Sequence, residues 1–234
     1  MSAYSEEFGA NSTWPAGATH RMNRMYRRQR HIYDGTRRYY LLGRDQLIAG
    51  LKPAKGDSVL EIGCGTGRNL VQAAQLYPDA RFFGIDVSTE MLTSAISAIS
   101  RRGLKERVRV AHGDGTAFDP QNLFGMASFD HLFISYSLSM IPDWRRVLEA
   151  AAGRLKPGGR LHIVDFGGQE RLPGFARALL RQWLAMFDVT PRDELARVLS
   201  AMADCAGADL KFERPFRGYA QYAVLRLPPE PAKP

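Results

Sequence analysis

Cysteine is scarce in this chain of 234 residues, which has only two, Cys64 and Cys205. Two cysteines cannot build the disulfide framework of a small secreted protein. The amino terminus, MSAYSEEFGANSTWPAG, also lacks the basic start and apolar run of a secretory signal. We therefore expect a cytoplasmic protein in which both thiols are reduced.

Long apolar runs and metal-ligand patterns are also absent. No stretch approaches the roughly 18 uninterrupted apolar residues of a membrane-spanning helix. The five histidines are scattered, without metal-ligand spacing among themselves or with the cysteines. The composition, 45% hydrophobic and 24% charged, is ordinary for a globular protein. The sequence thus predicts one large domain with no spanning helix and no metal.

Acidic residues are few in one segment, residues 20–44, which holds eight arginines and only Asp34, a local charge of +7. The net charge of the whole chain is +8, so the remainder is almost neutral. Such a segment indicates an anionic partner: a phosphate backbone, an anionic membrane surface or a carboxylate substrate. A solvated helix face is the alternative interpretation.

Short apolar runs alternate with helical patterns along most of the chain. The runs lie at 58–62, 81–86, 107–112, 129–136 and 160–166, and two later ones at 209–214 and 219–227 fit a hairpin at a sheet edge. This alternation predicts βαβ units, hence an α/β fold whose parallel sheet is covered by helices on both faces. We expect a mobile lead over 1–19, a single domain over 20–227 and a disordered tail over 228–234. Within the domain, a helical arm (20–51) precedes the core (52–227).

Three helices are expected around the last strands. One covers 143–155, and another begins at Thr190-Pro191, a cap followed by proline. The third, 172–187, is amphipathic, with Leu172, Phe175, Leu179, Trp183 and Phe187 on one face. We expect that face either to pack as core or a lid, or to lie in a membrane interface.

The sharpest motif is Val59-Leu60-Glu61-Ile62-Gly63-Cys64-Gly65-Thr66-Gly67-Arg68-Asn69, a buried strand that runs through three glycines into a helix. Glycine lets a ligand approach the backbone closely. The third glycine comes one residue too early for the dinucleotide fingerprint G-x-G-x-x-G. Glu61 disfavours a pyrophosphate and suits a ligand that bears an ammonium group. Asn69 either caps the helix or contacts the ligand.

This loop resembles motif I of the Rossmann-like S-adenosylmethionine-dependent methyltransferases, and the resemblance extends over residues 58 to about 166. Asp86 follows Gly67 by 19 residues, Gly113-Asp114-Gly115 ends the third strand, and Leu155-Lys156-Pro157-Gly158-Gly159-Arg160 leads into the fifth. The resemblance implies a seven-stranded, mostly parallel Rossmann-like sheet that binds S-adenosylmethionine. Asp86 would accept the ribose hydroxyls, and Asp114 the adenine amino group. The cofactor residues we assign are Tyr26, Tyr33, Glu61, Gly63, Cys64, Gly65, Asp86, Val87, Met91, Gly113, Asp114, Gly115 and Ser135.

The methyl acceptor has to be sought outside this core. Ser135-Tyr136-Ser137-Leu138 after the fourth strand contains no Asn-Pro-Pro-Tyr motif for adenine amines, and there is no Pro-Cys nucleophile for pyrimidine carbon 5. In the arm, tyrosine and arginine alternate at helical spacing: Tyr26, Arg30, Tyr33, Arg37, Tyr40 and Arg44. Tyrosine faces attract methylated ammonium groups, and arginine forks bind carboxylates or phosphates. A helix packed on the sheet with its arginines in water is the alternative.

The arm, YRRQRHIYDGTRRYYLLGRD, together with LEIGCGTGRN, closely resembles the bacterial betaine-lipid N-methyltransferases. That family trimethylates the homoserine amine of diacylglycerylhomoserine. The resemblance implies a lipid headgroup as substrate and peripheral association with the anionic inner leaflet of the membrane. The enzyme that makes the unmethylated lipid is a further candidate partner, and no nucleic acid is expected.

The acceptor residues are assigned from their chemistry. We expect Arg30, Arg37, Arg44 and Tyr39 to bind substrate, and Tyr136, Tyr40 and Asp165 to act on the amine, with Asp165 a candidate for taking its proton. No metal is expected to take part. Two other functions stay open: a methyltransferase for another small amine or RNA, and a non-catalytic protein that binds S-adenosylmethionine.

Overall fold

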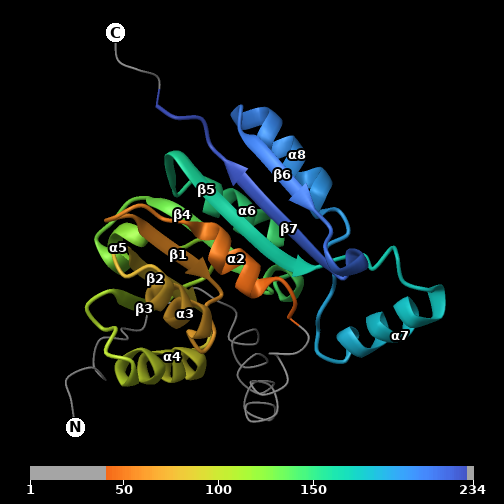
Figure 1. Ribbon diagram of the computed structural model, residues 1–234, viewed down its shortest axis with the longest axis horizontal. Helices are drawn as coiled ribbons and strands as arrows, with labels where there is room; N and C mark the ends of the chain where they lie inside the picture. The colour runs from red at the N-terminus through yellow and green to blue at the C-terminus, as the bar shows by residue number, and fades with distance from the viewer. Residues whose placement is uncertain (1–40, 231–234) are drawn as a thin grey trace.

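The computed structural model describes residues 41–230, and Figure 1 shows one mixed sheet with helices on both sides. Its strands are β1 (Ser58–Ile62), β2 (Arg81–Asp86), β3 (Val108–His112), β4 (Phe129–Ser135), β5 (Leu155–Phe166), β6 (Asp209–Glu213) and β7 (Ala220–Arg226). Its helices are α2 (Arg44–Leu51), α3 (Arg68–Leu76), α4 (Thr89–Arg101), α5 (Pro120–Phe124), α6 (Trp144–Ala152), α7 (Gly174–Ala185) and α8 (Leu195–Ala206), with 3₁₀ turns η2 (Leu138–Met140) and η3 (Phe216–Gly218).

The strand order is β3-β2-β1-β4-β5-β7-β6. The pairs from β3 to β5 are parallel, whereas β7 pairs antiparallel with both β5 and β6. The predicted seven-stranded, mostly parallel α/β sheet is confirmed, and so is the hairpin of the last two strands. Because β1 lies between β2 and β4, the chain reverses its direction of winding at the β1–β4 boundary. Ligands of open α/β sheets bind at such a point, beyond the carboxyl ends of the strands.

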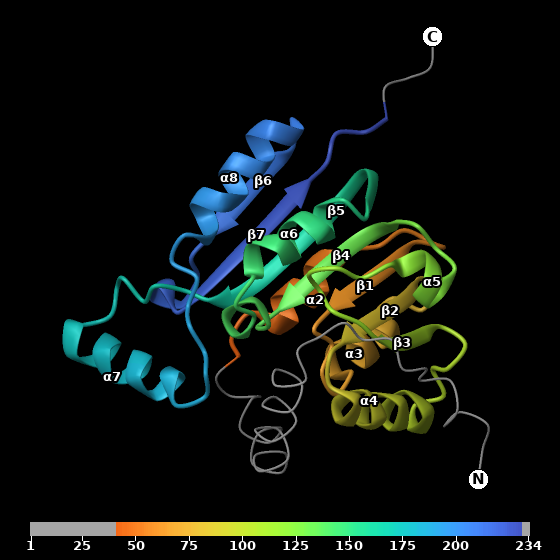
Figure 2. The same cartoon turned by 180° about the vertical axis from the view of Figure 1, so that it is seen from behind.

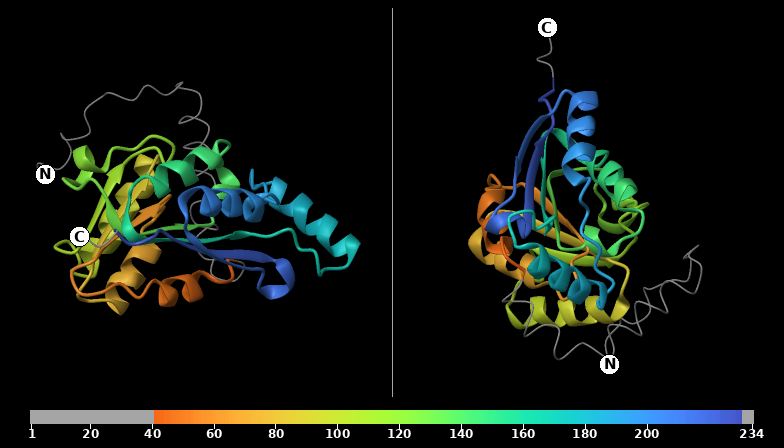
Figure 3. Two further views of the ribbon diagram at one scale, coloured as in Figure 1. Left: turned by 90° about the horizontal axis from the view of Figure 1, so that it is seen from above. Right: turned by 90° about the vertical axis from the view of Figure 1, so that its right-hand side faces the viewer.

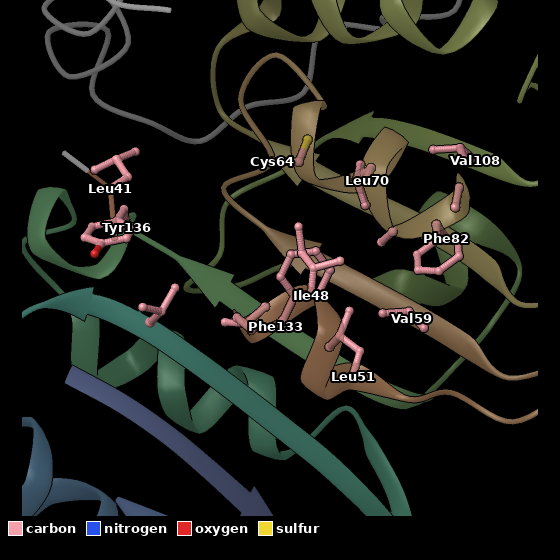
Figure 4. Close-up of a cluster of buried hydrophobic side chains, with 14 of the residues drawn as sticks. Leu41, Ile48, Leu51, Val59, Cys64, Leu70, Phe82, Val108, Phe133 and Tyr136 are labelled. Atoms are coloured by element: carbon pink, nitrogen blue, oxygen red, sulfur yellow. The ribbon is translucent and has the colours of Figure 1, made fainter. Parts of the chain in front are cut away.

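Two hydrophobic cores lie on opposite faces of the sheet. Helices α2, α3 and α4 cover one face, where Ile48 and Leu70 share a core with Phe82 and Phe133 (Figure 4). Leu92 of α4 belongs to the same core. Helices α5, α6 and α8 cover the other face, where Leu148 of α6 and Leu199 of α8 share a core with Leu132 and Ile163. Figure 2 shows α6 and α8 over the sheet from that side. Burial of both faces explains why the central strands read as nearly continuous apolar runs.

Several expected boundaries are wrong, and the helix expected over 143–155 ends at Ala152. The fifth strand begins at Leu155 rather than at residue 160, because Leu155 already pairs with Phe129 and the glycines at 158 and 159 form a register shift inside the strand. The helix expected from Thr190-Pro191 begins only at Leu195. The Thr190 N–H instead donates to the Ser139 carbonyl at 2.9 Å. This hydrogen bond to a distant loop holds Thr190 outside the helix, although the following proline predicts a helix start there.

Helix α7 extends away from the rest of the chain, beyond the carboxyl end of β5 (Figure 3). It is shorter than the expected 172–187, and Leu184 is its only buried residue. Its predicted apolar face is divided. The Trp183 and Phe187 rings pack against each other with centroids 5.1 Å apart, while Phe175 is 80% and Leu179 68% exposed. No helix among residues 41–230 is long and apolar enough to cross a membrane.

Candidate cofactor site

The glycine loop lies at the point where the winding reverses. Gly63 and Cys64 both donate their N–H groups to the Ile85 carbonyl, at 2.9 and 3.0 Å, so the loop is held against the end of β2. The Ser137 hydroxyl, just beyond β4, donates to the Ile62 carbonyl at 3.1 Å. The ends of β1, β2 and β4 thus meet around one loop, as the motif order predicts.

A buried carboxylate lies directly before this loop. Glu61 is 1% exposed, and its Oε1 accepts a 2.7 Å hydrogen bond from the Asn69 side-chain amide on α3. Its Oε2 is buried and has no hydrogen-bond partner among the described residues. Burial raises the pKa of Glu61 well above its usual value, although the bond from Asn69 opposes the shift. A buried carboxyl with one vacant acceptor oxygen fits a cationic ligand group that pairs with it.

Asn69 is therefore a functional residue whose role the sequence left open. Helix α3 begins after Gly67, which makes no side-chain capping bond, and Asn69 faces Glu61 instead of capping the helix. The seven residues between Glu61 and Asn69 span the whole glycine loop. The Glu61–Asn69 hydrogen bond thus closes the loop at its base.

Asp86 holds the other side of the loop. One of its carboxylate oxygens accepts the Gly65 N–H at 2.7 Å, and the other accepts the Ser88 N–H at 2.9 Å. Ser88 in turn caps α4 by accepting the Met91 N–H. Asp86 therefore orders the loop, and its carboxylate lies at the place where the motif predicts an acceptor for the ribose hydroxyls.

The loop glycines differ in the space around them. A Cβ on Gly65 would meet no atom within 4 Å, whereas one on Gly63 would lie 2.7 Å from the Ser137 Cβ. Both have positive φ, 53° at Gly65 and 75° at Gly63, which favours glycine. Open space beside Gly65 suits a ligand lying against the backbone. The Cys64 side chain is buried in the core beside Leu70, so only its backbone can face that ligand (Figure 4).

The remaining predicted cofactor residues surround the ends of β2 and β3. The Val87 carbonyl lies 3.2 Å from the His112 ring nitrogen, and Met91 is buried at the start of α4. Asp114, between Gly113 and Gly115, accepts hydrogen bonds from the Thr116 backbone N–H and hydroxyl. At the end of β4, the buried Ser135 hydroxyl oxygen has no hydrogen-bond partner among the described residues.

Tyr136, directly after β4, connects the sheet to Leu42 in the described part of the arm. It adopts a positive φ of 56°, which is uncommon for a bulky residue. Its ring packs edge-on against Phe166 with centroids 4.7 Å apart, and its hydroxyl donates to the Leu42 carbonyl. Burial, followed by the charge of Asp165, raises the pKa of Tyr136 well above its usual value. Its hydroxyl is therefore neutral and fixes the exit of the arm beside the end of β4.

Asp165 is completely buried and already hydrogen-bonded. Its two oxygens accept the N–H groups of Ser139, at 3.1 Å, and Phe166, at 2.7 Å. Burial raises the pKa of Asp165 to about 6. Nearby, the Arg192 guanidinium donates to the carbonyls of Leu138 and Ile141. These contacts hold the η2 loop after β4, a positioning role that the sequence did not reveal. Proton transfer by Asp165 stays a prediction.

The predicted acceptor residues fall mostly outside the described residues. Tyr26, Arg30, Tyr33, Arg37, Tyr39 and Tyr40 lie in that part of the chain. Arg44, at the start of α2, is 8% exposed, and its charge slightly opposes the rise that burial causes in the pKa of Glu61 and of Tyr136. Arg44 therefore lies near the cofactor loop and near the end of β4.

Replacing Asn69 with alanine tests the Glu61 site. A hydrogen bond to a charged group contributes about 1.5–3 kcal/mol, so we expect cofactor affinity to fall about tenfold or more. Losing the bond also raises the pKa of Glu61, so the affinity of Asn69→Ala should recover as pH rises, more steeply than wild type. Calorimetric titration with S-adenosylmethionine at several pH values measures this. Asn122→Ala removes an exposed amide bound to Asp119 and is the control; equal losses in both variants would refute the role of Asn69.

The unpaired Oε2 of Glu61 and the open space beside Gly65 fit S-adenosylmethionine. Its methionine ammonium would pair with Glu61, and its ribose hydroxyls would reach Asp86. Because Gly65 has open space where a side chain would project, the ligand can approach the backbone there. Within residues 41–230, no three histidine, cysteine, aspartate or glutamate side chains gather as metal ligands would.

Known proteins match the same region. Residues 59–159 match a family model described as a methyltransferase domain. The chain is 35% identical over 123 residues to an O-methyltransferase of Penicillium expansum and 30% identical over 134 residues to a demethylmenaquinone methyltransferase of Listeria monocytogenes. These matches cover 53% and 56% of this chain but only 43% and 54% of the two relatives, so the chain spans about half of their length.

Solved structures show the same fold at low identity. An O-methyltransferase family protein from Burkholderia thailandensis superposes with a TM-score of 0.68 at 19% identity, covering 92% of this chain and 64% of that one. The phosphoethanolamine N-methyltransferase 2 of Haemonchus contortus, solved with S-adenosyl-L-methionine, gives 0.64 at 18% identity, covering 80% and 52%. Residues 59–159 thus match a methyltransferase domain, and the chain has the α/β fold seen in these solved methyltransferases.

Proposed function

We propose that the chain is an S-adenosylmethionine-dependent N-methyltransferase that methylates the homoserine amine of diacylglycerylhomoserine, up to three times, to form a betaine lipid. The observation that carries the proposal is the arm sequence, with its alternating tyrosines and arginines and its resemblance to the betaine-lipid N-methyltransferases. The hydrogen bond from Tyr136 to the Leu42 carbonyl supports it, because it fixes the end of that arm beside the cofactor loop.

The arm's chemistry suits this acceptor. The headgroup carries an amine and a carboxylate on a lipid anchor. Arginines at 30, 37 and 44 offer forks for the carboxylate, and tyrosine faces tolerate the nitrogen as methyl groups accumulate. S-adenosylmethionine, when bound, supplies an electrophilic methyl group. The task of the protein is then to align a neutral amine with that methyl group and to exclude water, which needs positioning more than acid–base catalysis.

The relatives favour a second candidate. One of them is named for demethylmenaquinone, so a quinone acceptor is the main alternative to a lipid amine. A small free amine, RNA and a non-catalytic role are further alternatives. RNA binding would weaken steeply with added salt, because phosphate contacts release counterions.

Arginine variants in the arm separate acceptor binding from cofactor binding. We expect Arg30→Ala and Arg37→Ala to raise the KM for the lipid acceptor at least tenfold and to leave the Kd for S-adenosylmethionine within about twofold, since a charge-assisted bond to a carboxylate is worth about 1.5–3 kcal/mol. Arg28→Ala and Arg38→Ala are the matched controls, because neither arginine belongs to the alternating series of tyrosines and arginines in the arm. Radiolabel transfer to diacylglycerylhomoserine, free homoserine, a demethylated quinone and RNA ranks the acceptors. A preference for any of the others, or equal losses of cofactor and acceptor binding, would contradict the proposal.

A further inference from the structure

Helix α7 exposes large apolar side chains to an unusual degree. Among residues 41–230, six large hydrophobic residues are exposed. Two of them lie on α7, Phe175 at 80% and Leu179 at 68%, and a third, Met186 at 67%, directly follows the helix. Spaced by four and seven residues, they fall on one side of the helix. We call Phe175, Leu179 and Met186 the apolar stripe. No described element covers it, and Figure 3 shows α7 standing clear of the sheet.

Helix α7 itself carries charge of one sign, because Gly174–Ala185 contains Arg177 and Arg181 and no acidic residue, and Arg171 precedes it. The nearest acids flank the helix: Glu170, which pairs with Arg214, and the exposed Asp188. Arg181 pairs with Asp193 of the following loop, whereas Arg171 and Arg177 have no ion pair with a described residue. Arg177 and Arg181 lie on the side of the helix opposite the stripe. Arginines on one side and large apolar residues on the other are typical of helices that lie in the interface of an anionic bilayer.

The position of α7 suits such a surface. The chain leaves β5 at Phe166 and reaches α7 through residues 167–173, so α7 stands beyond the carboxyl edge of the sheet that also carries the glycine loop (Figure 1). The base of this connection is fixed, because the Gln169 N–H donates to the Gly218 carbonyl at 2.9 Å and Glu170 pairs with Arg214. The stripe therefore belongs to a helix at the same end of the sheet as the cofactor loop.

We propose that α7 is a membrane-docking helix whose apolar stripe enters the interface of an anionic lipid bilayer. This inference rests on the proposed function for its purpose, which is to bring a lipid headgroup to the cofactor site. A second copy of the chain fits the stripe less well. Three side chains bury about 500 Å² on each partner, below the roughly 800 Å² of a stable interface.

Vesicle sedimentation of the full chain tests the inference without any methyl transfer. The probes are vesicles of phosphatidylcholine and phosphatidylglycerol in equal parts, and vesicles of phosphatidylcholine alone. We expect wild type to prefer the anionic vesicles and the double variant Phe175→Ser, Leu179→Ser to bind them at least tenfold more weakly, since each buried apolar side chain contributes substantially to partitioning. Leu76→Ser and Ile96→Ser, at exposed apolar positions on α3 and α4, are the matched controls and should bind as wild type does.

The outcomes separate this inference from the proposed function. Unchanged S-adenosylmethionine binding in the double variant shows that it is folded. Three results would each overturn the docking role. The double variant could bind vesicles as wild type does, the controls could lose as much vesicle binding as the double variant, or the double variant could lose self-association instead of vesicle binding. If the double variant still methylates detergent-dissolved acceptor, the proposed function stands whatever the vesicle result. If no acceptor lipid is methylated but the stripe still governs sedimentation, the docking role stands alone.

Discussion

Replacing Asp86 with alanine should weaken S-adenosylmethionine binding more than 100-fold. The substitution removes the acceptor for the Gly65 N–H at 2.7 Å and for the Ser88 N–H at 2.9 Å. It also removes the carboxylate that we expect to accept the ribose hydroxyls. Hydrogen bonds to a charged group contribute about 1.5–3 kcal/mol each, and about 2.7 kcal/mol is a factor of 100 in affinity. Isothermal titration of the purified variant measures the loss.

Two controls separate the site from general damage to the fold. Asp119 also accepts a backbone N–H two residues ahead, at the start of α5, so Asp119→Ala removes a similar local bond away from the glycine loop. Its cofactor affinity should match wild type. Asp86→Asn keeps the shape without the charge and should lie between wild type and alanine. Near-normal binding by Asp86→Ala would refute the assignment of the loop.

A valine at position 65 probes the same loop from the other side. The backbone strain of a side chain at positive φ is shared by Gly65→Val and Gly207→Val, because φ is 53° and 59° and neither Cβ would meet an atom within 4 Å. Only position 65 faces the expected ligand. Loss of cofactor binding in Gly65→Val alone confirms the loop, whereas loss in both variants would attribute it to strain.

Acid should destabilise the protein through His162. This side chain is 1% exposed, and neither ring nitrogen has a hydrogen-bond partner among the described residues. Burial, reinforced by the charges of His131 and Arg160, lowers the pKa of His162 to about 3, from 6.5 in the unfolded chain. Between these values the unfolded state binds more protons, so the free energy of unfolding falls as pH falls from 6.5 toward 3. The slope from one such group approaches about 1.4 kcal/mol per pH unit.

The His162→Leu variant isolates this contribution. It removes the titrating ring and two unsatisfied nitrogens, so at pH 7 we expect it to be at least as stable as wild type. Asp165 acts in the opposite direction, because burial raises its pKa to about 6 and its protonation favours the folded state below that pH. The free energy of unfolding of each protein is measured by denaturant titration at several pH values, and the difference between the two proteins cancels the Asp165 contribution. A difference that stays constant from pH 7 to pH 4 would contradict the account.

The sheet could be predicted from the sequence because its strands are buried on both faces. Runs such as Ser58–Ile62 and Arg81–Asp86 contain several apolar residues in succession and end at glycine or aspartate, a local signal that survives folding. The helix start at 190–191 failed for the opposite reason. Thr190 and Arg192 hydrogen-bond to the loop after β4, a partner about 50 residues away that no local pattern encodes.

The cofactor side of the site was more predictable than its supporting contacts. Glycine spacing and the acids at 61 and 86 are features of the sequence itself. The bond between Asn69 and Glu61 depends on how α3 packs against β1, and the role of Asp165 depends on Ser139 approaching from a separate loop. The sequence predicts one apolar face over 172–187, but the structure divides it. Trp183 and Phe187 pack against each other, whereas Phe175 and Leu179 are exposed to solvent.

Mass spectrometry of lipids tests the central claim most directly. Purified protein that binds S-adenosylmethionine would be incubated with the isotope-labelled cofactor and vesicles that contain diacylglycerylhomoserine. The account predicts labelled products with one, two and then three added methyl groups, in that order of appearance. A protein that binds the cofactor yet leaves the lipid unlabelled would contradict the claim, and the methyltransferase domain would then act on a different acceptor.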